Sequence, residues 1–449
     1  MSTREPRLPD ASAGPRARRA RRARRGFTLV ELLVAMTAGL AVATAALLLA
    51  RNASRFFQYE ARFSSAHMAA LLGMNRITND LRRAGLLSSP NVLQDPSICG
   101  STATWPDGMR RLSGVTIVRN GSWLANVAAL AQSDVNGLRP DSLVIGGAFG
   151  SNEQFDVQAI YSGAGGGWNV QLQALQDAMK RTDARTAAGG AGLDEIFLPG
   201  RLLRIVTDKQ PSQVYGVISG FDQATLTVRL DATPALPIKD AGVCGVSFGG
   251  SNSGFLVNAV SRVRYDIRSL QGHPRYGALV APISPEVTGD NGRTELVRVE
   301  LDAYDAEMPD TLELVAEYAV DLKFGISTAS LVGNPSVDPQ VQRYPVQTPE
   351  FNEVYSFAAD VADNNGTPQR IRSVQVRLST RTRAPDRDAN LTYPAGVETR
   401  RLRFLIPGVV PGVNALSDVV PPGAPAVFAR MRTLQAEVAL PNHERAQRW

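Results

Sequence analysis

Residues 27–50 read FTLVELLVAMTAGLAVATAALLLA, and this stretch decides the fold of the chain. Its 24 residues include one charged side chain, Glu31. At 1.5 Å per residue, a helix of this length covers about 36 Å and crosses the hydrocarbon core of a bilayer. Nine arginines precede it within residues 1–25. They predict a cytoplasmic N-terminus and export of the chain after Ala50.

The helical pattern continues beyond the apolar stretch and changes character. Gly85 provides a helix stop, and no proline occurs between Phe27 and Leu87. We therefore predict one helix over about 27–84, with 27–50 in the membrane and 51–85 as an amphipathic continuation. Apolar residues at steps of three and four mark the face that would pack under a head: Phe56, Tyr59, Phe63, Ala66, Ala70, Met74, Ile77 and Leu81.

The positive charge is concentrated at the start of the chain. Residues 1–25 carry nine arginines against Glu5 and Asp10, a net charge of +7. The whole chain has a net charge of +6, so the remaining residues have a net charge of about −1. The remaining chain therefore gives no support to nucleic-acid binding. A secretory signal peptide would also begin with basic residues, but this apolar run is too long for one and Arg51 and Asn52 follow it directly. An ordinary signal anchor offers no reason for the carboxylate of Glu31.

The segment RRGFTLVELLVAM, residues 24–36, resembles the class III signal of type IV prepilins and secretion pseudopilins. The resemblance implies a leader, residues 1–26, that a prepilin peptidase removes by cutting between Gly26 and Phe27. It also implies methylation of the new amino group on Phe27. Glu31 would then be the family's assembly glutamate, paired with the N-terminal amine of a neighbouring subunit. Burying the two charges together is tolerable, whereas burying either one alone is costly.

A second resemblance lies at the end of the predicted helix. ITNDLRRAGLL, residues 77–87, is similar to a run in PilW-type minor pilins, with Asp80 and Arg82 as either a subunit contact or a solvated pair. Three later stretches, 260–268, 313–326 and 371–382, resemble strands of that family more loosely. This implies other major and minor pilins, an inner-membrane assembly platform and membrane lipid as partners. It also implies a single-pass protein with a periplasmic head that later reaches the cell surface in a pilus.

The remainder, residues 86–449, predicts a large extracytoplasmic head rich in antiparallel strands, so that the fold class is α+β. One unit is the simplest organisation, and a division near Gly250 is the alternative. Short helices are expected at Leu172–Lys180 and Thr311–Val320, and Thr182–Gly192 reads as a linker. Period-two patterns predict strands at Gly114–Val118, Ser142–Gly146, Phe155–Tyr161, Trp168–Leu172, Leu202–Val206, Gln213–Ile218, Thr225–Leu230, Leu256–Ile267, Tyr276–Val280, Glu295–Leu301, Leu322–Ile326, Ile371–Ser379, Thr399–Leu405 and Thr433–Ala439.

Cys99 and Cys244 are the two cysteines of the chain. In an oxidising compartment they predict a structural disulfide, and two buried thiols are the alternative. His67, His273 and His443 lack metal-binding spacing. The polar segments near Asp290 and Asp360 are interpreted as ordinary turns and not as calcium sites. We expect no metal, no cofactor and no enzymatic activity.

The size of the head, some 360 residues, favours a minor pilin that initiates or caps a pilus over a subunit repeated along its shaft. Leu47-Leu48-Leu49 stands where many major pilins have a proline, which also favours a minor or pseudopilin role. A type II secretion pseudopilin is the second hypothesis. A pilus-displayed adhesin or DNA-uptake module is the third, and the near-neutral charge argues against DNA.

Overall fold

The structure is a computed structural model. It describes residues 28–118, 136–207, 212–238, 244–246, 249–250, 254–280, 290, 292–330, 340–346, 367–386, 403–406, 408–413, 418 and 420–446.

The dominant helix, α1, spans Leu29–Arg82, which confirms the predicted continuous helix to within two residues. It ends where Gly85 takes a φ of 71°, the left-handed conformation that glycine adopts most readily. The chain divides into two compact units, Met1–Glu60 and Ala61–Trp449. In the first unit, the described part of α1 exposes its apolar side chains. It is the one helix among the described residues that is long and apolar enough to cross a membrane, by length and composition.

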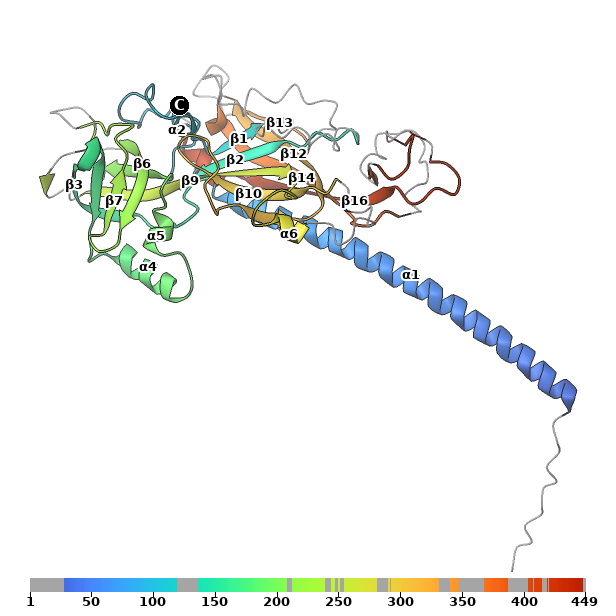
Figure 1. Ribbon diagram of the computed structural model, residues 1–449. Helices are drawn as coiled ribbons and strands as arrows, with labels where there is room; N and C mark the ends of the chain where they lie inside the picture. The colour runs from blue at the N-terminus through green and yellow to red at the C-terminus, as the bar shows by residue number, and fades with distance from the viewer. Residues whose placement is uncertain are drawn as a thin grey trace, which may run out of the picture. The chain divides into compact units, whose positions relative to one another are not determined.

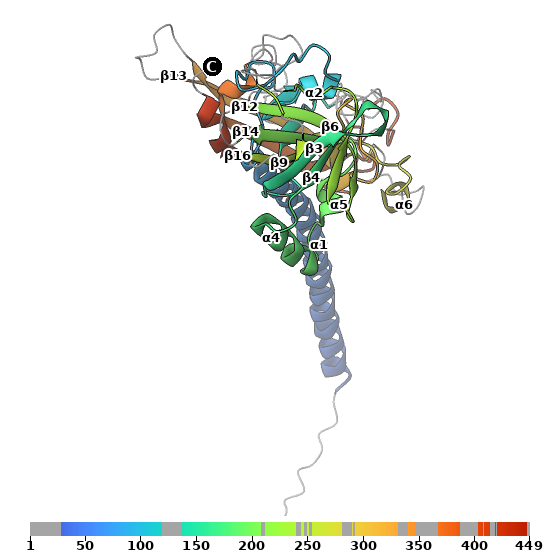
Figure 2. The same ribbon diagram turned by 90° about the vertical axis from the view of Figure 1, so that its left-hand side faces the viewer.

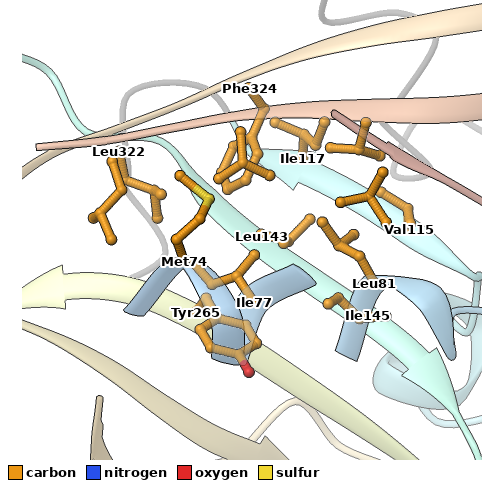
Figure 3. Close-up of a cluster of buried hydrophobic side chains, with 14 of the residues drawn as sticks. Met74, Ile77, Leu81, Val115, Ile117, Leu143, Ile145, Tyr265, Leu322 and Phe324 are labelled. Carbon is orange, nitrogen blue, oxygen red and sulfur yellow. The ribbon is translucent and has the colours of Figure 1, made fainter. Parts of the chain in front are cut away.

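In the second unit, the end of α1 supplies one side of the largest hydrophobic core. Met74, Ile77 and Leu81 are buried against strands of two sheets (Figure 3). Their spacing of three and four residues confirms this part of the predicted stripe. α1 approaches both sheets closely at Gly73, because a Cβ atom there would lie 2.7 Å from Leu378 Cδ2 and 3.2 Å from Leu296 Cδ2.

The first sheet that covers α1 is antiparallel, with strand order β1-β2-β9-β10-β11. Its strands are β1 Val115–Val118, β2 Ser142–Gly147, β9 Phe255–Arg268, β10 Glu295–Leu301 and β11 Glu313–Ala316. Alternate residues of β9, Val263, Tyr265 and Ile267, enter the core with α1. The short helix α2, Asp107–Arg110, precedes β1.

The second sheet over α1 has the order β13-β12-β14-β16-β15. Its strands are β12 Ala319–Ser330, β13 Gln340–Tyr344, β14 Ile371–Arg381, β15 Arg403–Leu405 and β16 Phe428–Ala439. A 3₁₀ turn, η6 Pro368–Arg370, leads into β14, and another, η9 Pro441–Ala446, follows β16. Asn442 in η9 donates hydrogen bonds to the carbonyl of Arg82, the last residue of α1, at 3.4 Å and to that of Ala84, just beyond it, at 3.0 Å.

The N-terminal half of β9 belongs to a closed antiparallel barrel. The pairings run β9-β5-β6-β7-β4-β3 and return to β9, where Phe155 lies opposite Val257. The strands are β3 Phe155–Ser162, β4 Trp168–Leu172, β5 Leu202–Thr207, β6 Gln213–Asp222 and β7 Thr227–Leu230, with a short edge strand, β8 Gly249–Gly250, on β3. Figure 1 shows β9 running from this barrel into the layer of β2 and β10.

The barrel has a hydrophobic core of its own, separate from that beneath the sheets. Phe155 and Phe197 are fully buried within it, with ring centres 5.4 Å apart. Two helices, α4 Asp177–Ala187 and α5 Leu193–Ile196, add Met179 and Ile196 to this core (Figure 2). A 3₁₀ turn, η2 Ala164–Gly166, joins β3 to β4.

Three local predictions are wrong. Tyr276–Val280, predicted as a strand, contains the helical turn α6 Gly277–Val280, which packs Val280 over the outer face of the first sheet. Thr311–Val320, predicted as a helix, forms β11 and the start of β12 around a turn in which Tyr318 has a φ of 53°. Sheet pairing with β10 and β14 overrides its helical periodicity.

The third wrong prediction concerns the chain after β4. Leu172 ends that strand, the helix begins at Asp177, and it extends to Ala187 through part of the predicted linker. The helix is amphipathic, burying Ala178, Met179 and Thr182. As a whole the fold is α+β, with a long N-terminal apolar helix followed by a large antiparallel β-rich head.

Candidate assembly site at the start of the helix

Thr28 and Glu31 close the first turn of α1 with reciprocal hydrogen bonds. The amide of Glu31 donates to Thr28 Oγ1 at 3.2 Å, while the amide and hydroxyl of Thr28 donate to Glu31 Oε2 at 3.0 and 3.1 Å. This is a capping box, the Thr-x-x-Glu pattern that satisfies otherwise unpaired amides at a helix start. The sequence alone contains this signal at residues 28–31, and our interpretation of Glu31 as a charge partner overlooked it.

The capping box orients the Glu31 carboxylate and leaves it able to bind more. Both bonds from Thr28 reach Oε2, and no other described residue donates to Oε1. A carboxylate has about four acceptor positions, so an incoming cation would still find vacant ones. Gly26 and Phe27, the predicted cleavage and methylation residues, lie outside the described residues.

The surface around this site is apolar on all sides of the helix. Leu29, Leu40 and Leu49 expose 80%, 70% and 75% of their surfaces. The hydroxyls of Thr37 and Thr44 bond to carbonyls of Val34 and Leu40, so these two side chains satisfy their polar groups within the helix. A helix that is apolar all round requires lipid or other helices around it.

The other end of α1 carries a buried charge cluster. Asp80 Oδ2 accepts hydrogen bonds from the hydroxyl of Tyr265 at 2.6 Å and from Arg298 Nε at 2.8 Å. Arg76, one turn earlier on α1, lies 3.8 Å from the other oxygen of Asp80. Burial and the Asp80 charge raise the pKa of Tyr265 above its ordinary value, which keeps this hydroxyl protonated as a donor.

This cluster contradicts one of the two alternatives offered for Asp80 and Arg82, that of a solvated pair. Asp80 is buried and bonded within the head, so it is not a solvated residue, whereas Arg82 is exposed. The partners Tyr265 and Arg298 lie on β9 and β10, far away in the sequence. A single sequence gives no means of pairing Tyr265 and Arg298 with Asp80. The signal that the sequence does contain is an aspartate on the apolar side of the predicted helix.

Cys99 and Cys244 form a disulfide, with Cα atoms 5.7 Å apart. Cys99 is buried in the barrel core and Cys244 packs against it. The amide of Cys99 also donates to the carbonyl of Gln213 in β6. The bridge therefore fastens the segment before β1 to the barrel.

The described residues contain no group of three or more histidine, cysteine, aspartate or glutamate side chains placed to hold a metal ion. His443 is fully buried in η9, and His273 is hydrogen-bonded near an exposed turn. The candidate turn at Asp360 lies outside the described residues. Asp290 instead accepts hydrogen bonds from Tyr318 and Arg383, at 2.7 and 2.8 Å.

Comparison with known proteins locates a family signature around the capping box. Residues 21–47 match the prokaryotic N-terminal methylation motif. The motif indicates a type IV pilin-like or pseudopilin protein, and with it processing by prepilin peptidase and association with other pilins. The motif and the apolar helix are consistent with an anchor in the inner membrane. No curated protein and no solved structure matches the chain.

Proposed function

We propose that this chain is a minor type IV pilin that enters a pilus and helps to initiate or cap it. Cleavage between Gly26 and Phe27 and methylation of Phe27 precede assembly. The observation that carries the proposal is the methylation motif at 21–47, which heads one continuous helix joined to a large β-rich head. The head then lies in the periplasm before assembly and at the cell surface afterwards. It has a structural and not an enzymatic role, without cofactor.

Glu31 would pair with the N-terminal amine of a neighbouring subunit inside the filament. The capping box supports this role, because Thr28 fixes the carboxylate at the start of α1 before any partner arrives. In an apolar surrounding the paired charges offset a desolvation cost that either would bear alone. The pair would thereby set the axial position of one subunit against the next.

Two measurements test the proposal. Mass spectrometry of the mature protein should find N-methyl-phenylalanine at Phe27. An intact leader, or cleavage beyond Ala50, would contradict the proposal that the chain is a pilin. Glu31→Ala should insert into the membrane normally and be absent from sheared pili. Thr44→Ala is the matched control, since its hydroxyl bonds only to its own helix and its loss should leave incorporation unchanged.

A type II secretion pseudopilin is the second candidate, because the methylation motif is common to both kinds of protein. The length of the head favours the pilus. Genes encoding other prepilins and a pilus tip protein beside this one would favour the minor pilin, and genes for a secretion channel would favour the pseudopilin.

A further inference from the structure

A cavity of about 280 Å³ lies in the head beside α1. Small side chains of the helix, Ser65, Ala66 and Ala69, form one wall. Three arginines, Arg293, Arg381 and Arg383, line it from other elements, together with Tyr318, Glu317 and Leu279. The cavity is outside the candidate assembly site at the start of α1, and the packing of the core does not account for its charged lining.

Neighbouring groups hold the arginines in place. The guanidinium carbons of Arg293 and Arg381 lie 4.5 and 5.1 Å from the centre of the Tyr318 ring, within cation–π range.

Carboxylates complete this support. Arg383 donates from Nε and Nη2 to Asp290 at 3.0 and 2.8 Å, and Arg293 Nε donates to Glu295 at 2.5 Å. Asp290 and Glu295 are themselves buried. Guanidinium groups fixed in this way lose little further freedom when they bind a ligand.

The three arginines of the cavity have three carboxylates beside them, of which Glu317 alone is a lining residue. Glu317 is the one carboxylate among the lining residues; its side chain is 57% exposed and reaches Arg293 Nη2 at 3.3 Å. Burial lowers the pKa of Arg381 to about 10, although nearby Tyr318, Asp290 and Glu295 oppose this shift. Because three carboxylates already balance the three arginines, another carboxylate can bind here only by exchange with the exposed one, Glu317.

We propose that this cavity receives a glutamate or aspartate side chain from a neighbouring subunit, which displaces Glu317 from Arg293. The proposal rests on the proposed assembly function. Arginine pairs with carboxylates through two parallel hydrogen bonds, and Nη1 of Arg383 makes no hydrogen bond to any described residue. Ala66, Ala69 and the 72% exposed Leu279 supply apolar surface for the methylene groups of the incoming side chain.

Binding can be measured with the full mature chain in detergent micelles. The probe is the capped peptide acetyl-Ala-Glu-Ala-amide, and its glutamine counterpart is the neutral control. We expect saturable binding of the glutamate peptide at least about tenfold tighter than the glutamine peptide, from charge-assisted hydrogen bonds. Equal binding of the two peptides would overturn the proposal.

Two variants place the binding in the cavity. Arg383→Gln should weaken binding at least about tenfold, while Glu317→Gln should tighten it by removing the competing carboxylate. Glu317 is exposed, so that variant is informative even if Arg383→Gln fails to fold. Arg229→Gln removes an exposed arginine paired with Asp222 on the barrel and should leave the affinity unchanged. Unchanged affinity in both cavity variants would contradict the assignment.

Anionic lipid is the competing ligand. Soluble glycerol 3-phosphate serves as the probe, because the apolar helix would insert into any vesicle. Its binding to the wild type but not to Arg383→Gln, with no binding of the glutamate peptide, would replace our proposal with a phosphate site. Peptide binding is independent of pilus assembly. Its failure alongside normal incorporation rejects the cavity alone, and loss of incorporation in Glu31→Ala with peptide binding intact concerns the assembly site alone.

Discussion

At the scale of single residues, Asp80 belongs to a buried ion pair, so its loss should destabilise the head. Asp80→Ala removes the acceptor shared by the buried guanidinium of Arg298 and the hydroxyl of Tyr265. The carboxylate that remains near Arg298 is that of Glu313, 3.8 Å from Nη1 and 44% exposed. Removing one partner of a buried ion pair typically costs about 3–5 kcal/mol. We expect a loss of this size in the free energy of unfolding, measured by urea denaturation.

The control for Asp80 is Asp107→Ala. Asp107 is 75% exposed and lies 4.0 Å from Arg110, a surface pair with a contribution of about 0–1 kcal/mol. Equal losses in the two variants would show that the buried cluster has no special role in stability.

His443 should make the stability of the head depend on pH. Burial, with a smaller contribution from Arg372, lowers the pKa of His443 from 6.5 to about 4. The unfolded chain therefore binds a proton near pH 6.5 while the folded chain does not. The free energy of unfolding should fall as the pH drops from 6.5 to 4, by up to about 3 kcal/mol from this residue.

Urea denaturation at pH 7.5 and 4.5 tests this prediction, with His443→Gln as the comparison. The variant should lose less stability between the two pH values than the wild type. The same change at His273, which lies near an exposed turn, is the control and should preserve the wild-type difference. An identical pH dependence of the unfolding free energy in wild type and His443→Gln would show that His443 is not its cause.

At the scale of elements, Gly73 sets the distance between α1 and the two sheets. A Cβ atom at this position would approach Leu378 Cδ2 to 2.7 Å and Ala316 Cβ to 3.2 Å, both in the buried core. Gly73→Val should cost about 1–3 kcal/mol of unfolding free energy through overpacking. Gly220→Val is the control at a glycine with no atom within 4 Å of its Cβ position, and it should cost less. The reverse order would contradict the close contact.

The elements also show what the sequence could and could not predict. The sequence pattern located Trp168–Leu172 and Glu295–Leu301 to the residue. In the first strand Val170 and Leu172 alternate into the core, whereas all seven residues of the second are buried, because both faces of β10 are covered. LELVAEYAV was predicted as a helix because its apolar spacing fits both periods, and the choice depends on pairing with β10 and β14. At the start of α1, the pattern in residues 24–36 predicted the methylation motif that residues 21–47 match. At the other end of the helix, the partners of Asp80 depend on long-range contacts, which a single sequence does not contain.

At the scale of the whole molecule, the disulfide closes a loop of 145 residues that contains the barrel strands β3 to β7. Replacing Cys99 and Cys244 by serine should lower the free energy of unfolding by about 2–5 kcal/mol, mainly by enlarging the unfolded ensemble. Reductant should destabilise the wild type to a similar extent and leave the double variant unchanged. A wild type that is insensitive to reductant under unfolding conditions would contradict the bridge.

The strand β9 is a member of both the barrel and the sheet on α1. A pull on the barrel would therefore be transmitted through one unbroken backbone, Phe255–Arg268, with no flexible linker to absorb it. Along its second half, β9 is bonded on both sides, to β2 and β10. Tension along this strand would shear those hydrogen bonds together instead of opening them one by one. Force applied to the barrel would therefore enter the sheet on α1 as a shear load on these two ladders.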